Sequence, residues 1–292
     1  MKIAIYSRVF HKSDINEIQE LFNCIFKYEL EPIVFEEYYN TIKSKISFKK
    51  DVVTFSTHSD IKNVAECMIS VGGDGTLLDT ITYIRDSGIP VVGINVGRLG
   101  FLASTGREDI EATIKAITNK AYSIDYRTLI HVDSNLPVFG EVNYGLNEFS
   151  IHKKDSSSMI TIHTYINGEL LNSYWADGLI IATPTGSTGY NLSCGGPIIF
   201  PSSENFVITP IAPHNLNVRP IIVSDTSILS FEIEGRNESF LCTLDSRYEA
   251  IDNSYQLAVS KETFKIGLLR INDINFLETL RTKLMWGADK RN

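Results

Sequence analysis

The sequence has few cysteines, no excess of basic residues and no long apolar run. Its four cysteines lie far apart and none belongs to a C-x-x-C pair, which disfavours a zinc ribbon or redox motif and indicates buried thiols in a reducing cytosol. No stretch approaches the ~18 apolar residues that a membrane span needs, and the first residues resemble a strand more than a signal peptide. We therefore expect a cytoplasmic protein with no membrane partner.

The charge and the histidines exclude further classes of protein. The formal net charge is −8 and the pI is near 5.3, whereas nucleic-acid binding rests on basic surface patches, so we expect no nucleic-acid partner. The six histidines are scattered without the spacing of metal ligands, so we expect no metal ligated by the protein alone. The chain also lacks the Walker A signature and the G-x-G-x-x-G fingerprint, which argues against a Rossmann dehydrogenase.

The periodicity of apolar residues predicts two domains. Residues 1–121 alternate short apolar strands with amphipathic helices, which predicts an α/β domain with a parallel sheet in Rossmann-like layers. Residues 122–265 have almost no helical period and predict an all-β domain, with a hairpin turn at Asn167-Gly168. The tail, residues 266–292, returns to α/β character with a helix over 274–284, and we expect it to pack on the first domain.

A glycine-rich segment, Gly72–Thr76, lies between an apolar run at 68–71 and a helical pattern at 77–85. A strand, a glycine turn and a helix start form a natural anion site, because glycine lets phosphate approach the backbone and the helix N-terminus offers free N–H groups. Asp74 adds a negative charge to this loop. It either accepts a proton from a substrate hydroxyl, holds a magnesium ion, or caps the following helix.

A second polar loop, from Thr183 to Ser193, follows a predicted strand at 178–182. Its hydroxyls and glycines suit a ligand with ribose, phosphate and amide groups, and Tyr190 can stack on a flat base. The alternative is an ordinary Ser/Thr/Gly turn. The charged run at 152–155 is expected to be a solvated turn, with Lys153 able to approach a phosphate, and His214 is expected to be a hydrogen-bonded loop residue.

Together these segments resemble the bacterial NAD kinases, which phosphorylate NAD to NADP. The GGDGT motif alone is shared with phosphofructokinases and lipid kinases, whereas its combination with TPTGST about a hundred residues later is specific. The family's fold, an α/β domain, a β-rich domain and a returning C-terminal segment, agrees with the pattern above. The resemblance spans roughly residues 68–247 and rests on Gly72–Thr76, Gly93–Leu102, Asn147-Glu148, Asp177-Gly178, the 183–190 run with Ser193, and 213–216.

The resemblance implies a role for each matching residue. Asp74 is implied as the catalytic carboxylate, which takes the proton of the adenosine ribose 2′-hydroxyl of NAD as that oxygen attacks the γ-phosphoryl of ATP. Asp177 is implied to meet the nicotinamide amide. ATP with a divalent metal, expected to be Mg²⁺, and a homodimer or homotetramer complete the implied site. The other implied substrate-binding residues are Gly75, Asn147, Glu148, Trp175, Thr185, Thr188, Gly189, Tyr190, Asn191, Leu192, Ser193, Ala212 and Arg247.

Two positions depart from the family pattern. Trp175 stands two residues before Asp177, where many relatives carry a basic residue, so we expect weak discrimination between NAD and NADH. Arg247 stands where relatives often carry Gln, and it either directs charge towards a phosphate or lies on the surface.

Two other functions fit part of the sequence. One is a lipid or sugar kinase that uses the same GGDGT loop, although the net charge of −8 disfavours a membrane surface. The other is a non-catalytic NAD(P)-binding regulator, which Asp74 disfavours because a pure binder gains nothing from a carboxylate beside phosphates.

Overall fold

The computed structural model describes residues 1–97, 100–103, 105–154, 158–236, 239–271 and 276–285. The chain forms two compact units, residues 1–126 with 266–292 and residues 127–265. None of the helices within the described ranges is long and apolar enough to cross a membrane.

The first unit is built on a parallel sheet of order β5-β4-β1-β2-β3, and the final residues of β18 add to its β5 edge through Leu268 opposite Val91. The strand Cys67–Val71 is buried along its whole length, as expected for a sheet covered on both faces. The predicted α/β class is confirmed. The strands are β1 (Lys2–Tyr6), β2 (Glu31–Phe35), β3 (Val53–Phe55), β4 (Cys67–Val71), β5 (Val91–Asn95) and β6 (Thr105–Gly106).

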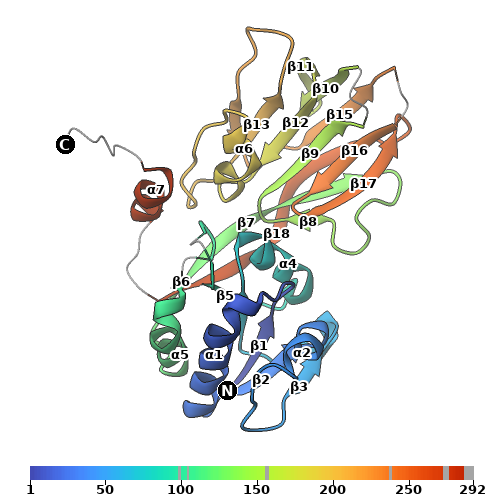
Figure 1. Cartoon of the computed structure of the whole chain (residues 1–292). Helices are drawn as coiled ribbons and strands as arrows, with labels where there is room; N and C mark the ends of the chain where they lie inside the picture. The colour runs from blue at the N-terminus through green and yellow to red at the C-terminus, as the bar shows by residue number, and fades with distance from the viewer. Residues whose placement is uncertain (98–99, 104, 155–157, 237–238, 272–275, 286–292) are drawn as a thin grey trace, which may run out of the picture. The chain divides into compact units, whose positions relative to one another are not determined.

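Amphipathic helices cover this sheet. In α1, buried Ile18, Leu21 and Ile25 recur at helical spacing, and α1 lies beside α5 (Figure 1), where Lys27 ion-pairs with Glu111. The helices beside the sheet are α1 (Ile15–Lys27), α2 (Glu36–Ile42), α3 (His58–Ile61), α4 (Asp74–Ile84) and α5 (Ile110–Thr118), with 3-10 turns η1 (Lys12–Asp14) and η2 (Arg107–Asp109). The tail contains α7 (Phe276–Leu284). Of the predicted tail helix, residues 274 and 275 lie outside the described residues.

The second unit is a sandwich of two antiparallel sheets. One has the order β14-β13-β12-β9-β16-β17, and the other joins β11-β10-β15 to the first half of β18, with β7 and β8 at its edge. Apolar side chains of both sheets form one buried core, in which the rings of Phe149 and Phe231 lie 6.2 Å apart. The strands are β7 (Ser123–Ser134), β8 (Tyr144–Gly145), β9 (Glu148–Lys153), β10 (Ile160–Ile166), β11 (Glu169–Ala176), β12 (Gly178–Ala182), β13 (Asn205–Ile211), β14 (Ile221–Ser224), β15 (Leu229–Glu234), β16 (Ser239–Leu244), β17 (Arg247–Asp252) and β18 (Leu257–Arg270).

Two local predictions in this unit have different outcomes. The Asn167-Gly168 hairpin is confirmed, since both residues have positive φ (51° and 85°) and connect β10 to β11. The predicted solvated turn at 152–155 is wrong for its first two residues. His152 and Lys153 belong to β9, which pairs with β12 on one side and β16 on the other, and residue 155 lies outside the described residues.

The polar loop at 183–193 lies against the outer face of the six-stranded sheet. It contains η3 (Gly186–Thr188) and α6 (Tyr190–Ser193), and Figure 1 shows α6 beside β12 and β13. A small apolar cluster of Ile180, Ala182, Val207 and Ile199, with Cys194 packed on it, attaches the loop to the sheet. The loop therefore presents its polar groups on a rigid support.

Candidate functional site

The glycine loop connects the buried strand β4 to the first turn of α4. Gly72 has a φ of 146°, and a Cβ at this position would lie 2.5 Å from Thr76 Oγ1, so the turn requires glycine. A Cβ built at Gly73 or Gly75 would meet no atom within 4 Å. The backbone at these two positions is therefore open to the close approach of a ligand.

Asp74 is the first residue of α4, but the N-cap is Gly73 and no side chain caps the helix. The helix-cap alternative for Asp74 is therefore wrong. The carboxylate instead accepts three backbone N–H groups of a loop 27 to 29 residues away: Phe101 at 2.8 Å on Oδ2, and Leu102 at 3.1 Å and Ala103 at 2.9 Å on Oδ1. Because Oδ2 accepts one of these bonds and Oδ1 accepts two, Oδ2 keeps a lone pair for a further donor.

Gly100 sits directly against this carboxylate. A Cβ at Gly100 would lie 1.8 Å from Asp74 Oδ1, so any larger residue would displace Asp74. The loop and the carboxylate thus fit each other only with glycine at this position.

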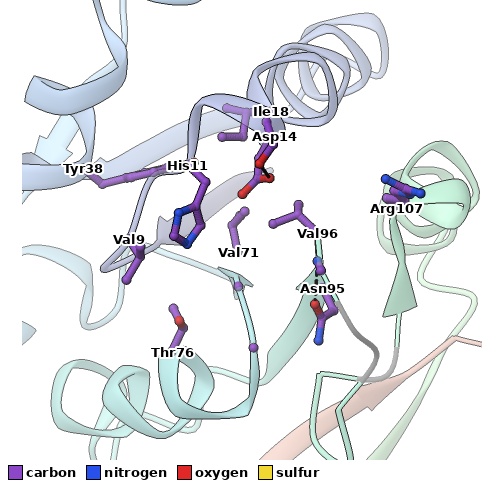
Figure 2. A pocket seen from close by; sticks show the side chains of 14 residues that line it. Val9, His11, Asp14, Ile18, Tyr38, Val71, Thr76, Asn95, Val96 and Arg107 are labelled. Carbon is purple, nitrogen blue, oxygen red and sulfur yellow. Dashed lines mark hydrogen bonds between the residues drawn. The ribbon is translucent and has the colours of Figure 1, made fainter.

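A cavity of about 550 Å³ lies at the carboxyl ends of β1, β4 and β5 in the first unit. Three helical segments begin around it: Asp14 precedes α1, Gly73 precedes α4, and Arg107 opens the turn that leads into α5 (Figure 2). Helix N-termini carry partial positive charge and free N–H groups, so their convergence favours an anion. The lining residues are Val9, His11, Ser13, Asp14, Ile18, Tyr38, Val71, Gly72, Gly73, Thr76, Asn95, Val96, Gly97 and Arg107.

In the second unit, Asp245 holds the backbone of the Asn147-Glu148 pair. The half-buried Asp245 carboxylate accepts the N–H groups of Leu146, Asn147 and Glu148 at 2.7, 2.8 and 3.1 Å. Burial, together with the negative charge of Asp245, raises the pKa of Glu148 to about 8. The sequence reasoning did not identify Asp245, because it lies nearly a hundred residues from the backbone that it holds.

The side chains of Asn147 and Glu148 point to one spot beside Gly189. A Cβ at Gly189 would lie 3.0 Å from Glu148 Oε2 and 3.3 Å from Asn147 Nδ2. Within the described residues, Asn147 Oδ1 and Glu148 Oε2 are buried and have no hydrogen-bond partner. A buried acceptor without a partner is costly, so both oxygens are suited to the hydroxyl or amide groups of a ligand.

The polar loop divides into residues that build the loop and residues that face outward. Thr185 is buried and accepts a hydrogen bond from Arg127 at 3.1 Å, and buried Asn191 donates to the carbonyl oxygens of Ser187 and Pro197 and accepts from Thr209. The loop's outer residues are more accessible: Thr188, Gly189 and Leu192 are half-buried, and Tyr190 and Ser193 are exposed.

His152, Lys153 and Asp177 lie at the adjacent ends of β9 and β12, and His152 contacts Tyr190. The ring of His152 stacks on Tyr190 at 5.8 Å with an interplanar angle of 25°, and burial lowers the pKa of His152. Lys153 Nζ lies 2.6 Å from Asp177 Oδ1. The sequence reasoning placed His152 and Lys153 in a turn, and the signal that would have corrected it is the alternation of Glu148, Ser150 and His152 along one strand face.

The remaining predicted residues lie at different places of the second unit. The Trp175 side chain is 44% exposed, and the centroid of its ring lies 4.2 Å from the centroid of the His214 ring. The backbone N–H of His214 also donates to the Trp175 carbonyl oxygen. Ala212 is exposed and has a φ of 44°. Arg247 is half-buried and donates to the carbonyl oxygens of Val142 and Tyr144, so Arg247 is not a plain surface residue.

A carboxylate held in a glycine loop at the edge of a parallel sheet is typical of a phosphotransferase, and the buried oxygens of Asn147 and Glu148 in the β-sandwich indicate a polar ligand such as a nucleotide. Comparison with known proteins agrees: the family model for the ATP-NAD kinase N-terminal domain matches residues 13–122, and that for the ATP-NAD kinase C-terminal domain matches residues 146–268. The chain belongs to the NAD kinase family, which confirms the resemblance.

Relatives and solved structures support this assignment. The NAD kinase of Cytophaga hutchinsonii is 50% identical over 293 residues, and that of Flavobacterium psychrophilum is 45% identical over 294 residues, each covering 100% of both chains. A yeast NADH kinase complexed with NADH has a TM-score of 0.88 at 23% identity, covering 99% of this chain and 88% of that one. An NAD kinase from Archaeoglobus fulgidus in complex with ATP has a TM-score of 0.73 at 23% identity, covering 98% and 99%. At these identities the two structures establish the fold.

Proposed function

We propose that this protein transfers the γ-phosphoryl group of ATP to the 2′-hydroxyl of the adenosine ribose of NAD, giving NADP and ADP. Family membership supports this reaction, and the observation that carries the mechanism is the Asp74 carboxylate, which three N–H groups hold in the glycine loop. The free lone pair of Oδ2 takes the proton of the 2′-hydroxyl as that oxygen forms its bond to phosphorus. The bond from the γ-phosphorus to the bridging oxygen breaks, and ADP leaves.

The cavity beside the glycine loop is the proposed site of the ATP phosphates. The unobstructed backbone at Gly73 and Gly75 and the start of α4 supply N–H groups. Arg107 supplies a positive charge at the cavity wall, partly offset by Glu17, which lies 3.6 Å from its guanidinium. Phosphoryl transfer depends mainly on positioning and charge neutralisation, so these groups suit it. Among the described residues no group of three or more His, Cys, Asp or Glu side chains could hold a metal; we therefore propose that the divalent metal, Mg²⁺ by expectation, arrives as part of the ATP substrate.

The polar groups around Asn147 and Glu148 in the second unit are the proposed site for NAD, which we call the dinucleotide pocket. Asn147 and Glu148 offer oxygens to ribose hydroxyls or amide groups, and the exposed ring of Tyr190 offers a face for a base. Gly189 keeps the space in front of these oxygens open. Thr185 and Asn191, also proposed as substrate-binding residues, are buried, and their side chains bond to Arg127 and to the Ser187 carbonyl oxygen, so they support the shape of the loop.

A homodimer or homotetramer acting in the cytoplasm stays part of the proposal. The oligomer is supported by the edge strand β14, which carries half-exposed Ile221 and Ile222. Natural proteins usually cover such an edge, and a second subunit would do so.

The reaction is tested by measuring NADP formation from NAD, ATP and Mg²⁺ with the purified protein. Transfer of phosphate to a lipid or sugar but not to NAD would refute it, as would NAD binding without turnover. The donor cavity is tested by Arg107→Met, which should raise the KM for ATP about 3- to 10-fold and leave the KM for NAD unchanged. Lys115→Met removes a charge from α5 outside the cavity lining and is the matched control. An unchanged KM for ATP in Arg107→Met would contradict the assignment of the cavity.

A further inference from the structure

Lys153 and Asp177 form an ion pair that the sheet register imposes. Lys153 ends β9, and Asp177 directly precedes β12, the neighbouring strand. The Lys153 N–H donates to the Asp177 carbonyl oxygen at 2.9 Å, and the Lys153 ammonium lies 2.6 Å from Asp177 Oδ1. The backbone bond holds the two residues side by side on neighbouring strands, so the ammonium stays within reach of the carboxylate.

This ion pair borders the proposed dinucleotide pocket. Burial raises the pKa of the Tyr190 hydroxyl most, followed by Cys194, and the negative charge of Asp177 adds a smaller rise, so Asp177 lies near Tyr190 on the polar loop. The Tyr190 ring stacks on His152, the residue before Lys153. Trp175, two residues before Asp177, contacts the His214 ring and carries no charge. Lys153 is thus the cation that faces Asp177 in the described part of this pocket.

We propose that Lys153 is a specificity-determining residue, which sets the preference of the protein between the oxidised and the reduced dinucleotide. This inference rests on the proposed function and on the role that the family resemblance implies for Asp177, whose carboxylate would lie at the nicotinamide amide of the substrate. The oxidised nicotinamide ring is cationic and the reduced ring is neutral, so only the oxidised ring responds to the net charge at Asp177. Lys153 offsets the charge of Asp177 and thereby weakens the preference for the oxidised ring.

The two charges of the pair therefore act on selectivity in opposite directions. Lys153→Met uncovers the Asp177 carboxylate and should raise the NAD/NADH ratio of kcat/KM. Asp177→Asn leaves the Lys153 ammonium alone and should lower the ratio. The side chains are 22% and 36% exposed, so solvent screens both effects, and we expect changes of about 3- to 10-fold in each direction.

The experiment measures kcat/KM for NAD and for NADH with the full-length protein at low and high salt. Lys153→Met should raise the NAD/NADH ratio, Asp177→Asn should lower it, and the double variant should return towards the wild-type ratio. Lys154→Met is the matched control, because the next residue carries the same charge but lies 3.3 Å from Ser239 Oγ and not at Asp177. Lys153→Arg keeps the charge and should keep the wild-type ratio.

The proposal fails if Lys153→Met leaves the ratio unchanged, shifts it towards NADH, or shifts it no more than Lys154→Met does. If Lys153→Met does not fold, Lys153→Gln serves for the same comparison, since it keeps a polar group that can bond to Asp177. A wild-type protein that forms no NADP from NAD would instead refute the proposed function. The two failures are distinguishable, because the selectivity ratio is measured only on a protein that turns over.

Discussion

Replacing Asp74 with Asn removes the proton acceptor but largely keeps the structure of the loop. The substitution therefore tests the catalytic role of Asp74 separately from its structural role. In the native protein, Oδ1 accepts the N–H groups of Leu102 and Ala103, and Oδ2 accepts that of Phe101. An amide of the same shape keeps the two bonds to Oδ1 but turns an NH₂ group towards the Phe101 N–H. Two donors then face each other, and an N–H left without an acceptor costs about 1–3 kcal/mol.

We expect Asp74→Asn to lose turnover far more than stability. Loss of a general base lowers kcat by about 10²- to 10⁴-fold, with little change in the KM for NAD. The lost hydrogen bond should lower the Tm by roughly 3–10 °C, so the variant stays folded at 25 °C. Both quantities are measured on one preparation, by the rate of NADP formation and by thermal melting.

Asp79→Asn is the matched control for this experiment. Asp79 lies on the same helix and ion-pairs with Arg8 at 3.1 Å, so the substitution makes the same change of charge outside the glycine loop. It should leave kcat within about 2-fold of wild type, because Asp79 lies outside the glycine loop and its partner Arg8 is largely exposed, so this ion pair contributes little. Near wild-type turnover of a folded Asp74→Asn protein would refute the general-base role and leave Asp74 only the role of holding its loop.

Three further predictions test other parts of the structure. Gly100→Ala should lower kcat by at least about 10-fold although Asp74 is intact, because the new Cβ would lie 1.8 Å from the carboxylate; unchanged turnover would show that the carboxylate position is unimportant. Glu148 has a pKa raised from 4.5 to about 8 by burial and by Asp245, so its contribution to stability is full below about pH 4.5 and is lost as the pH rises through about 8. Glu148→Gln removes this titration and should flatten the fall in Tm between about pH 5 and pH 9, whereas an unchanged slope would assign the pH dependence to other groups. Sedimentation should give a dimer or tetramer, and a fully active monomer of 32.7 kDa would contradict the predicted oligomer.

Local patterns determined much of the fold. A helical spacing of apolar residues is sufficient to predict α1, because the buried face of an amphipathic helix follows from its own sequence. Asn167-Gly168 predicts its hairpin for the same reason, since the turn depends on the positive φ of two adjacent residues. The glycine loop at 72–76 is likewise visible in the sequence, because a strand, glycines and a helix start are adjacent along the chain.

The partners of the site residues were decided only by the tertiary structure. The sequence allowed Asp74 to be a helix cap, a magnesium ligand or a general base. The N–H groups that bond to its carboxylate belong to Phe101, Leu102 and Ala103, which lie 27 to 29 residues away. Asp245 holds the backbone of Glu148 from 97 residues away, and Lys153 meets Asp177 because β9 pairs with β12 in one particular register. Periodicity reports which face of an element is buried, but not which elements pair or in what register. The charges and hydrogen bonds of this site follow from that register, so they could not be predicted from the sequence alone.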